Sequence, residues 1–326
     1  MNGKVYGAQT DCQSSPGAAA VLDSGRRRPF LAVDGGLAFY HAPITTLKKR
    51  GFLHIVGVDL GGGKGKATAT ASLRVDAHGG ATVVDIAPRP GGAPLYDDAL
   101  LACLRGYGDE TLVAIDAPLT LPPCLRCQVA LCPGQAACVD PAVVQMKAIV
   151  ARGDAGLDRA NRRGKPRLTP YTQRATEVHL LVERGIVPRE ALGQGTGPLA
   201  ARAAHLTRAL TDRFRLNENL IEVSPKATLA GLGFTRPTRK HLDERQARAE
   251  VLEGLAPELR FGPGVWRELC VQKDHLFDAV ICAFTGYLWA RDGWRELETI
   301  DEAPAREGWI WVPPSQNGQM REPGVG

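Results

Sequence analysis

Residues 54–71 read HIVGVDLGGGKGKATATA, a short apolar run that delivers one carboxylate, Asp59, into a glycine-rich turn. The run from Ile55 to Leu60 has the length and flanking glycines of a buried strand, and residues 67–75 predict a second strand after a tight turn. Asp59 therefore lies at a strand end, facing the loop. A carboxylate is costly there unless a cation, hydrogen bonds or a metal ion compensate its charge, and we expect a divalent metal ion.

The glycine-rich turn at residues 61–66 resembles a phosphate-binding loop. Consecutive glycines let backbone N–H groups approach an anion, and Lys64 and Lys66 add positive charge. The pattern is not a Walker P-loop, because Leu60 occupies the position of the first glycine and Ala67 the position of the Ser or Thr. Two interpretations stay open: the lysines contact a phosphate, or they are solvated side chains of a hairpin turn.

The composition is that of an ordinary globular protein. With 326 residues, 44% hydrophobic and 23% charged, the chain is long enough for one large domain or a domain with an insertion. No segment has the apolar length of a membrane helix and the N-terminus lacks a signal-peptide pattern, so we expect no membrane partner and a cytoplasmic location. The net charge of +5 permits a nucleic-acid partner without requiring one. The oligomeric state stays open.

The predicted organisation is one main domain with an insertion. Residues 1–50 are interpreted as an irregular N-terminal extension, 51–314 as the main domain and 315–326 as a disordered tail. Residues 121–215 are interpreted as an insertion that holds a cysteine cluster and a basic loop at 159–167. Strands are predicted near 54–60, 67–75, 81–88, 111–116, 219–224 and 308–313, the first three antiparallel. Helices are predicted near 97–107, 172–184, 199–215, 227–232 and 273–291.

Two further carboxylates end or interrupt apolar elements. Asp116 closes an apolar strand just before Ala117-Pro118, and Asp278 lies inside an apolar helix, one turn after Asp274. Capping explains Asp274, whereas a buried Asp278 requires a partner. We expect Asp59, Asp116 and Asp278 to converge as a metal site, because two divalent ions about 4 Å apart need shared carboxylates to act on a phosphodiester. Capping or a salt bridge is the alternative for each acid.

Four of the eight cysteines lie within residues 124–138: Cys124, Cys127, Cys132 and Cys138. Their spacing is close to that of a zinc knuckle, with Cys where the knuckle has His. Four clustered thiolates repel one another unless a metal holds them, so we expect Zn²⁺. An iron–sulfur cluster and free or redox-paired thiols are the alternatives. Since the cluster starts eight residues after Asp116, we expect it beside the acidic site, where it could grip nucleic acid.

Five segments in this order and spacing resemble the domain-of-unknown-function 429 family, a group predicted to be ribonuclease H-like nucleases. They are GVD (57–59), IDAPL (115–119), IEVSPKATL (221–229), Asp274 with Asp278-Ala279, and GWIWVP (308–313). A more distant resemblance is to Holliday-junction resolvases, through His275-x-x-Asp278-Ala279 in the long helix. The likeness covers about residues 54–313.

The resemblance implies an α/β fold with a ribonuclease H-like mixed sheet, a Cys-rich helical insertion and Mg²⁺- or Mn²⁺-dependent nuclease activity. On this interpretation Asp59 bridges two ions, while Asp116 and Asp278 each hold one. Asp274 or Glu222 then completes the metal shell or orients the water.

Two basic residues are candidates for substrate contacts. Lys226, in the fourth-to-last position of the IEVSPKATL segment, is expected to contact a phosphate. Residues 172–177, TQRATE, also resemble a family motif. Arg174 within it either neutralises a phosphate or forms a helical salt bridge with Glu177.

Three function classes follow. The leading hypothesis is a metal-dependent nuclease that hydrolyses phosphodiester bonds in DNA or RNA. The second is a phosphotransferase or ATPase on an actin-like fold, which predicts a second Asp-x-Gly hairpin and a late adenosine-binding Gly-Gly segment, and neither is apparent. The third is a non-catalytic nucleic-acid- or protein-binding module, whose binding would survive EDTA.

Overall fold

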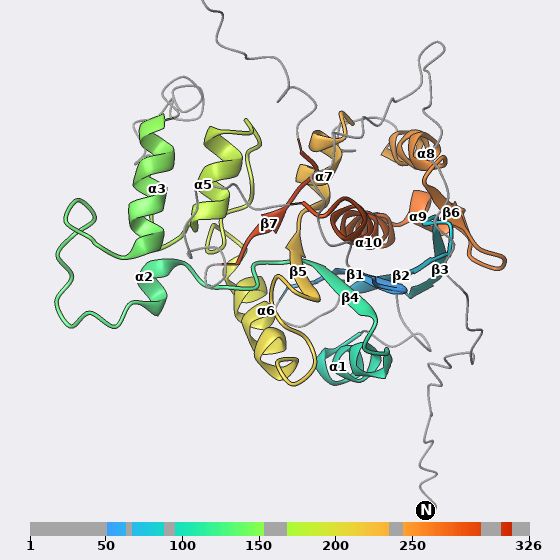
Figure 1. The fold of residues 1–326 in the computed structure, drawn as a ribbon, viewed down its shortest axis with the longest axis horizontal. Helices are drawn as coiled ribbons and strands as arrows, with labels where there is room; N and C mark the ends of the chain where they lie inside the picture. Colours follow the sequence, from blue (N-terminus) through green and yellow to red (C-terminus); the bar gives the residue numbers. More distant parts are fainter. Residues whose placement is uncertain are drawn as a thin grey trace, which may run out of the picture.

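The computed structural model describes residues 51–62, 67–87, 95–152, 168–234, 244–294 and 308–314. Within these residues the chain forms a mixed α/β fold around a seven-stranded sheet with the order β6-β3-β2-β1-β4-β5-β7 (Figure 1). The strands are β1 (His54–Asp59), β2 (Ala69–Val75), β3 (Ala81–Ala87), β4 (Thr111–Asp116), β5 (Leu220–Val223), β6 (Leu259–Phe261) and β7 (Ile310–Trp311). The helices are α1 (Asp97–Gly106), α2 (Pro123–Arg126), α3 (Pro141–Arg152), α5 (Ala175–Val182), α6 (Gly197–Ala209), α7 (Pro225–Gly231), α8 (Glu244–Leu255), α9 (Arg267–Gln272) and α10 (Asp274–Asp292).

The first three strands form the expected antiparallel ladder, with β2 between β1 and β3. From β1 outward the other half of the sheet is parallel, because β4 pairs with β1, β5 with β4, and β7 with β5. The carboxyl ends of β1, β4 and β5 therefore meet at one edge of the sheet. Side chains and loops that follow these strands gather at that edge.

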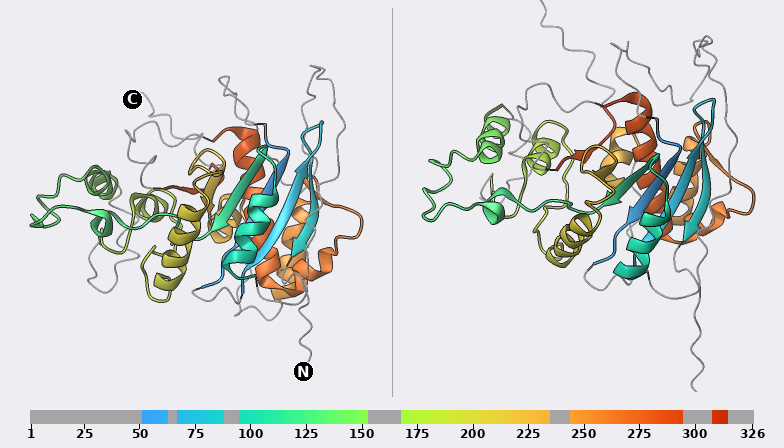
Figure 2. Two further views of the ribbon diagram at one scale, coloured as in Figure 1. Left: turned by 90° about the horizontal axis from the view of Figure 1, so that it is seen from below. Right: turned by 60° about the horizontal axis from the view of Figure 1, so that its bottom comes forward.

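Helices cover both faces of the sheet, with α10 and α7 on one side and α1 and α6 on the other (Figures 1 and 2). Side chains alternate along the strands. Ile55, Leu112 and Ala114 pack in the core that contains α10. Val56 and Val113 pack in the opposite core, with helices α1 and α6.

Helix α10 lies directly against β1, and a glycine makes this possible. A Cβ atom on Gly57 would lie 2.1 Å from the backbone oxygen of Ala279 and 2.3 Å from the backbone nitrogen of Ala283. Near the other end of β1, a Cβ on Gly286 of α10 would lie 2.9 Å from the Ile55 side chain. The helix therefore runs antiparallel to β1, and its N-terminal turn lies over the strand's carboxyl end.

Most predicted elements are confirmed within a few residues, and the region 121–215 is more regular than expected. Sequence analysis missed α2, α3, α8, α9 and β6, while the final strand is shortened to Ile310–Trp311. Helices α3 and α5 share a small core of Met146, Ile149 and Val178. Helix α6 instead packs on the main sheet through Ala203 and Leu206, so this part of the expected insertion belongs to the central core.

Several expectations concern residues outside the described ranges: the extension at 1–50, the tail at 315–326, the basic loop at 159–167, and Lys64 and Lys66. In the described part of the chain, none of the helices has the length and apolar character needed to span a bilayer.

Candidate functional site

Asp59 and Asp116 are register partners at the ends of the parallel strands β1 and β4. Four residues earlier in each strand, Ile55 and Leu112 are also partners, and both face the α10 core. Because side chains alternate along a strand, Asp59 and Asp116 project toward the same face. Asp59 is 9% exposed, so its carboxylate lies mostly out of solvent.

The N-terminal part of α10 brings Asp278, which is 8% exposed, to the same place. The thiol of Cys282, one turn further along α10, interacts electrostatically with all three acids. Burial raises the pKa of the Cys282 thiol well above its usual range, and the charges of Asp116, Asp59 and Asp278 raise it further. All three carboxylates are therefore within electrostatic reach of one sulfur atom. The structure brings together the three acids that the sequence singled out.

His275 is a functional candidate to which sequence analysis gave no role. Its Nδ1 lies 2.6 Å from Oδ2 of Asp59, and its side chain is 47% exposed. This hydrogen bond to Asp59 raises the pKa of His275, desolvation opposes it, and the charges of Asp59, Asp274 and Asp278 add to the increase. The available signal was the spacing, because residues 275 and 278 share a helix face.

Asp274 is the first residue of α10 and lies at the margin of this group. Its side chain is 52% exposed, and its Oδ1 accepts a hydrogen bond of 3.0 Å from the backbone N–H of His275. The contact is the kind expected of an acid in the first turn of a helix.

Glu222 lies on the opposite face of the sheet. Its register partner in β4 is Ile115, which packs in the core of α1 and α6. The carboxylate accepts hydrogen bonds from Leu119 N at 3.0 Å and from Arg174 Nη1 and Nη2 at 2.7 and 2.6 Å. The expectation that Glu222 completes the metal shell is therefore corrected, because alternation turns it away from Asp116 and its oxygens are already bonded.

Arg174 is fully buried between two carboxylates. Its Nη2 lies 2.5 Å from Glu177 Oε1, and its Nη1 also donates to Thr120 Oγ1 at 3.1 Å. Burial acts to lower the pKa of Arg174, but Glu177 and Glu222 together hold it above its usual range. The salt bridge to Glu177 is confirmed. The expected phosphate contact is corrected, because the guanidinium has 0% exposure.

A family profile described as "Protein of unknown function (DUF429)" matches residues 57–302. The chain belongs to the DUF429 family. The matched region contains the acidic group, Asp59, Asp116 and Asp278, and also His275. A search of curated proteins and a search of solved structures gave no match to this DUF429 chain.

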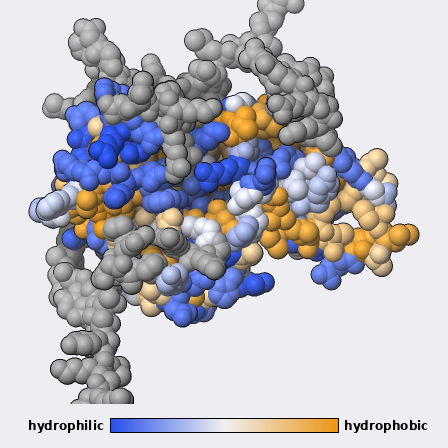
Figure 3. All heavy atoms as spheres, turned by 180° about the vertical axis from the view of Figure 1, so that it is seen from behind, coloured by the Kyte–Doolittle hydropathy of each residue, from blue (hydrophilic) through white to orange (hydrophobic). Residues whose placement is uncertain are grey.

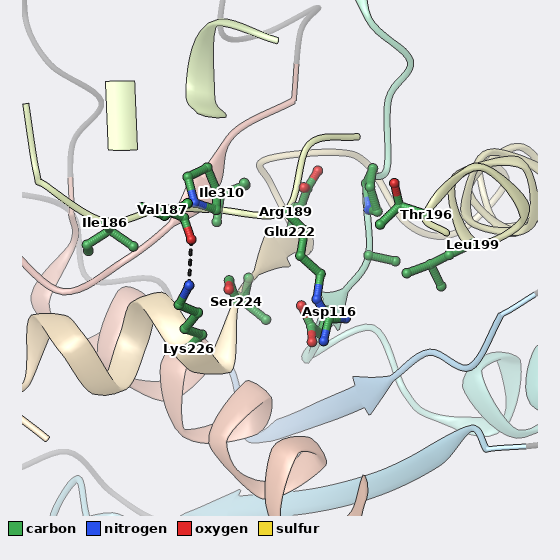
Figure 4. A pocket seen from close by; sticks show the side chains of 14 residues that line it. Asp116, Ile186, Val187, Arg189, Thr196, Leu199, Glu222, Ser224, Lys226 and Ile310 are labelled. Carbon is green, nitrogen blue, oxygen red and sulfur yellow. Dashed lines mark hydrogen bonds between the residues drawn. The ribbon is translucent and has the colours of Figure 1, made fainter. Parts of the chain in front are cut away.

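A pocket of the DUF429 protein adjoins Asp116 on the β5 side (Figure 4). Polar lining comes from two acids, two basic residues and two hydroxyl residues: Asp116, Glu222, Arg189, Lys226, Thr196 and Ser224. Lys226 Nζ donates to the backbone oxygen of Val187 at 2.7 Å, which ties α7 to the segment after α5. The expected phosphate-contacting lysine therefore lies at a pocket that shares a wall with Asp116.

The glycine turn after Asp59 is anchored by Arg202 of α6. Arg202 Nη1 donates to the backbone oxygen of Gly61 at 2.8 Å and to Thr68 Oγ1 at 2.6 Å, and Gly61 N donates to the same hydroxyl at 3.1 Å. Arg202 is buried, with 5% of its surface exposed, and it connects α6 to both ends of the turn.

The oxygen donors of Asp59, Asp116 and Asp278 match the chemistry of Mg²⁺ and Mn²⁺, which prefer carboxylates. Within the described ranges, no group of three or more His, Cys, Asp or Glu side chains is spaced as a ready metal site. The three carboxylates therefore suit a hard divalent cation by their chemistry, and not by a preformed arrangement.

The cysteine cluster of the DUF429 chain spans α2, which contains Cys124, and the loop between α2 and α3, at the end of the molecule farthest from β2 and β3 (Figure 1). All four thiols are free. The expectation that they lie beside the acidic group is corrected, because the chain after Asp116 leads outward, away from α10.

Proposed function

We propose that this DUF429 protein is a metal-dependent nuclease with a ribonuclease H-like fold. One observation carries the proposal: Asp59 of β1, Asp116 of β4 and Asp278 of α10 gather at one end of the sheet. The antiparallel strands β3-β2-β1 followed by parallel β4 and β5 support the fold, since the resemblance implies three antiparallel strands and then alternating helices and strands.

In this proposal Asp59, Asp116 and Asp278 hold Mg²⁺ or Mn²⁺. The ion, when bound, supplies an activated water and neutralises charge on the phosphodiester. Partial burial of Asp59 and Asp278 suits this role, because low exposure strengthens the attraction between a carboxylate and a cation.

His275 is suited to proton transfer in the same site. An ionised carboxylate only accepts hydrogen bonds, so the 2.6 Å contact assigns a proton on Nδ1 of His275, shared toward Asp59. The ring is half exposed, so its other nitrogen can meet a substrate oxygen or water. The contact with Asp59 raises the pKa of His275, which favours the protonated imidazolium, the form that can donate a proton to a leaving oxygen.

The pocket beside Asp116 supports a polyanionic substrate. Arg189 and Lys226 line it together with Ser224 and Thr196, a combination that can hold a phosphate near the acidic group (Figure 4). Glu222 at its wall is bonded to Arg174, which reduces its repulsion of an anion.

The test is cleavage of labelled single- and double-stranded DNA and RNA with Mg²⁺ or Mn²⁺, with and without EDTA. Asp59→Asn and Asp278→Asn are expected to lower cleavage by more than about 100-fold, the scale on which second-shell residues already affect metal enzymes. Asp98→Asn, an exposed acid of α1, is the matched control and is expected to cleave normally. Full cleavage by Asp59→Asn overturns the proposal. Binding that survives EDTA without turnover overturns it in favour of a binding module.

A further inference from the structure

The cysteine loop, residues 124–140, is a second concentration of ligating side chains, separate from the acidic group. It holds Cys124, Cys127, Cys132 and Cys138, of which the first three are exposed. From Cys127 to Asp140 the backbone forms neither helix nor strand. Irregular segments of this length in a compact protein are usually functional or held by something other than backbone pairing.

The loop begins with Cys124 in α2 and Cys127 at the C-terminal cap of that helix. It makes a turn just before Cys138, whose backbone N–H donates to the backbone oxygen of Gln135 at 3.4 Å. Gly134 has φ of +83°, a conformation that glycine adopts at little cost, and it directly precedes this turn.

The second half of the loop is attached to α3. Lys147 Nζ donates to the backbone oxygens of Ala136 at 2.9 Å and Cys138 at 3.0 Å. At the start of the loop, Cys124 N donates to the backbone oxygen of Pro170 at 3.1 Å. Both ends are thus fixed to the protein, and an ammonium group lies beside the last cysteine.

The apolar side chains of the loop are exposed and do not pack into a hydrophobic core. Leu131 is 86% exposed and Val139 85%, and neither belongs to the small core beneath α3 and α5. Figure 3 shows the apolar surface at this end of the molecule, with Leu125 and Val129 also exposed. A loop that buries so little apolar surface gains little stability from packing, which is the situation in which small modules use a metal.

We propose that Cys124, Cys127, Cys132 and Cys138 bind one Zn²⁺ ion with four sulfur ligands. The side chains described here do not form a ready-made cage of three or more ligands. Binding therefore draws the loop inward, and its irregular backbone between two fixed ends permits this. Four thiols release four protons and become four Zn–S bonds, with no change of oxidation state. The site then carries two net negative charges, which Lys147 partly offsets.

Zinc suits this loop better than a redox cluster, because the thiols lie in an exposed segment and Zn²⁺ has no redox chemistry to shield from solvent. The cysteine loop lies away from the acidic group, so the ion has a structural role. The inference is independent of the proposed nuclease activity, and either can fail alone.

The first experiment measures metal in the full-length protein purified anaerobically with a reductant. One zinc per chain is expected. After chelation, added Co²⁺ is expected to give the thiolate charge-transfer and tetrahedral d–d absorption bands, which Zn²⁺ then displaces. Cys132→Ser is expected to weaken zinc binding at least about 10-fold. Cys103→Ser, a partly buried thiol of α1, is the matched control and is expected to bind normally.

The second experiment uses limited digestion by chymotrypsin, which cleaves mainly after aromatic residues and also after accessible leucines, with the Leu131 site followed by mass spectrometry. Cleavage after Leu131 is expected to be fast in the metal-free protein and slowed by Zn²⁺, and Cys132→Ser is expected to lose this protection. A metal content near zero without cobalt bands overturns the inference. Equal zinc binding by Cys132→Ser, or stoichiometric iron with inorganic sulfide, also overturns it.

Discussion

Replacing Gly57 by alanine tests the packing that places Asp278 beside Asp59. An added Cβ would lie 2.1 Å from the backbone oxygen of Ala279, whereas ordinary contact begins at 3.4 Å, so helix and strand must separate by about 1.3 Å. The obstructing atoms belong to the backbone of α10 and cannot rotate away as a side chain would. Overpacking of this kind costs about 1–3 kcal/mol of unfolding free energy.

Gly108→Ala is the matched control, because no atom lies within 4 Å of the position of its added Cβ. Both substitutions remove a glycine from the unfolded chain, which by itself stabilises the folded state by about 0.4–1 kcal/mol. The difference between the two variants therefore isolates the clash. It is expected to be about 1–3 kcal/mol, with Gly57→Ala the less stable.

The assay is urea denaturation followed by circular dichroism, read as the difference in unfolding free energy between the two variants. If the proposed nuclease activity is confirmed, Gly57→Ala is also expected to cleave about 100-fold more slowly, since a misplacement of about 1 Å is enough for such a loss. Equal stability of Gly57→Ala and Gly108→Ala would refute the close helix–strand contact, and with it the reason why Asp278 meets Asp59.

Three further outcomes are expected. Glu222→Gln leaves the buried Arg174 with one charged partner fewer, so unfolding free energy should fall by about 3–5 kcal/mol, and an unchanged urea midpoint would contradict the buried network. The hydrogen bond to Asp59 raises the pKa of His275 in the folded state, so its stabilisation is complete at acidic pH and lost as pH rises through the raised value. The difference in unfolding free energy between the protein and His275→Gln should therefore be largest below about pH 6 and should shrink as the pH rises through the raised pKa of His275; a difference constant with pH is the contrary result. Burial keeps the pKa of Cys282 well above its usual range, so mass spectrometry should find this thiol unmodified by iodoacetamide until the protein unfolds.

The buried network of Arg174, Glu177 and Glu222 explains how the region after β4 is joined to the sheet. Arg174 precedes α5, while Glu222 is in β5, and both bond within the same cluster. The guanidinium also reaches Thr120, in the segment leading from β4 to α2. Three separate parts of the chain are thus fixed by one side chain, which makes Arg174 a positioning residue for the wall of the Asp116 pocket.

Local sequence was sufficient for the elements that carry the acids. The apolar runs ending in Asp59 and Asp116 are short and continuous, so their strands follow from pattern alone, and Asp278 stands out as an acid in an apolar helix. The same local pattern gave no sign of β6, a strand of three residues that exists through its pairing with β3.

Tertiary structure decided which side chains meet. Whether Glu222 joins the acids depends on the register of β5 against β4, and a shift of one residue would turn it to the other face. Arg174 and Arg202 are polar in sequence and buried in the fold, because carboxylates and backbone oxygens from distant segments surround them. The contact of His275 with Asp59 joins residues 216 positions apart. No local sequence pattern predicts this contact, because it depends on the packing of α10 against Gly57 of β1.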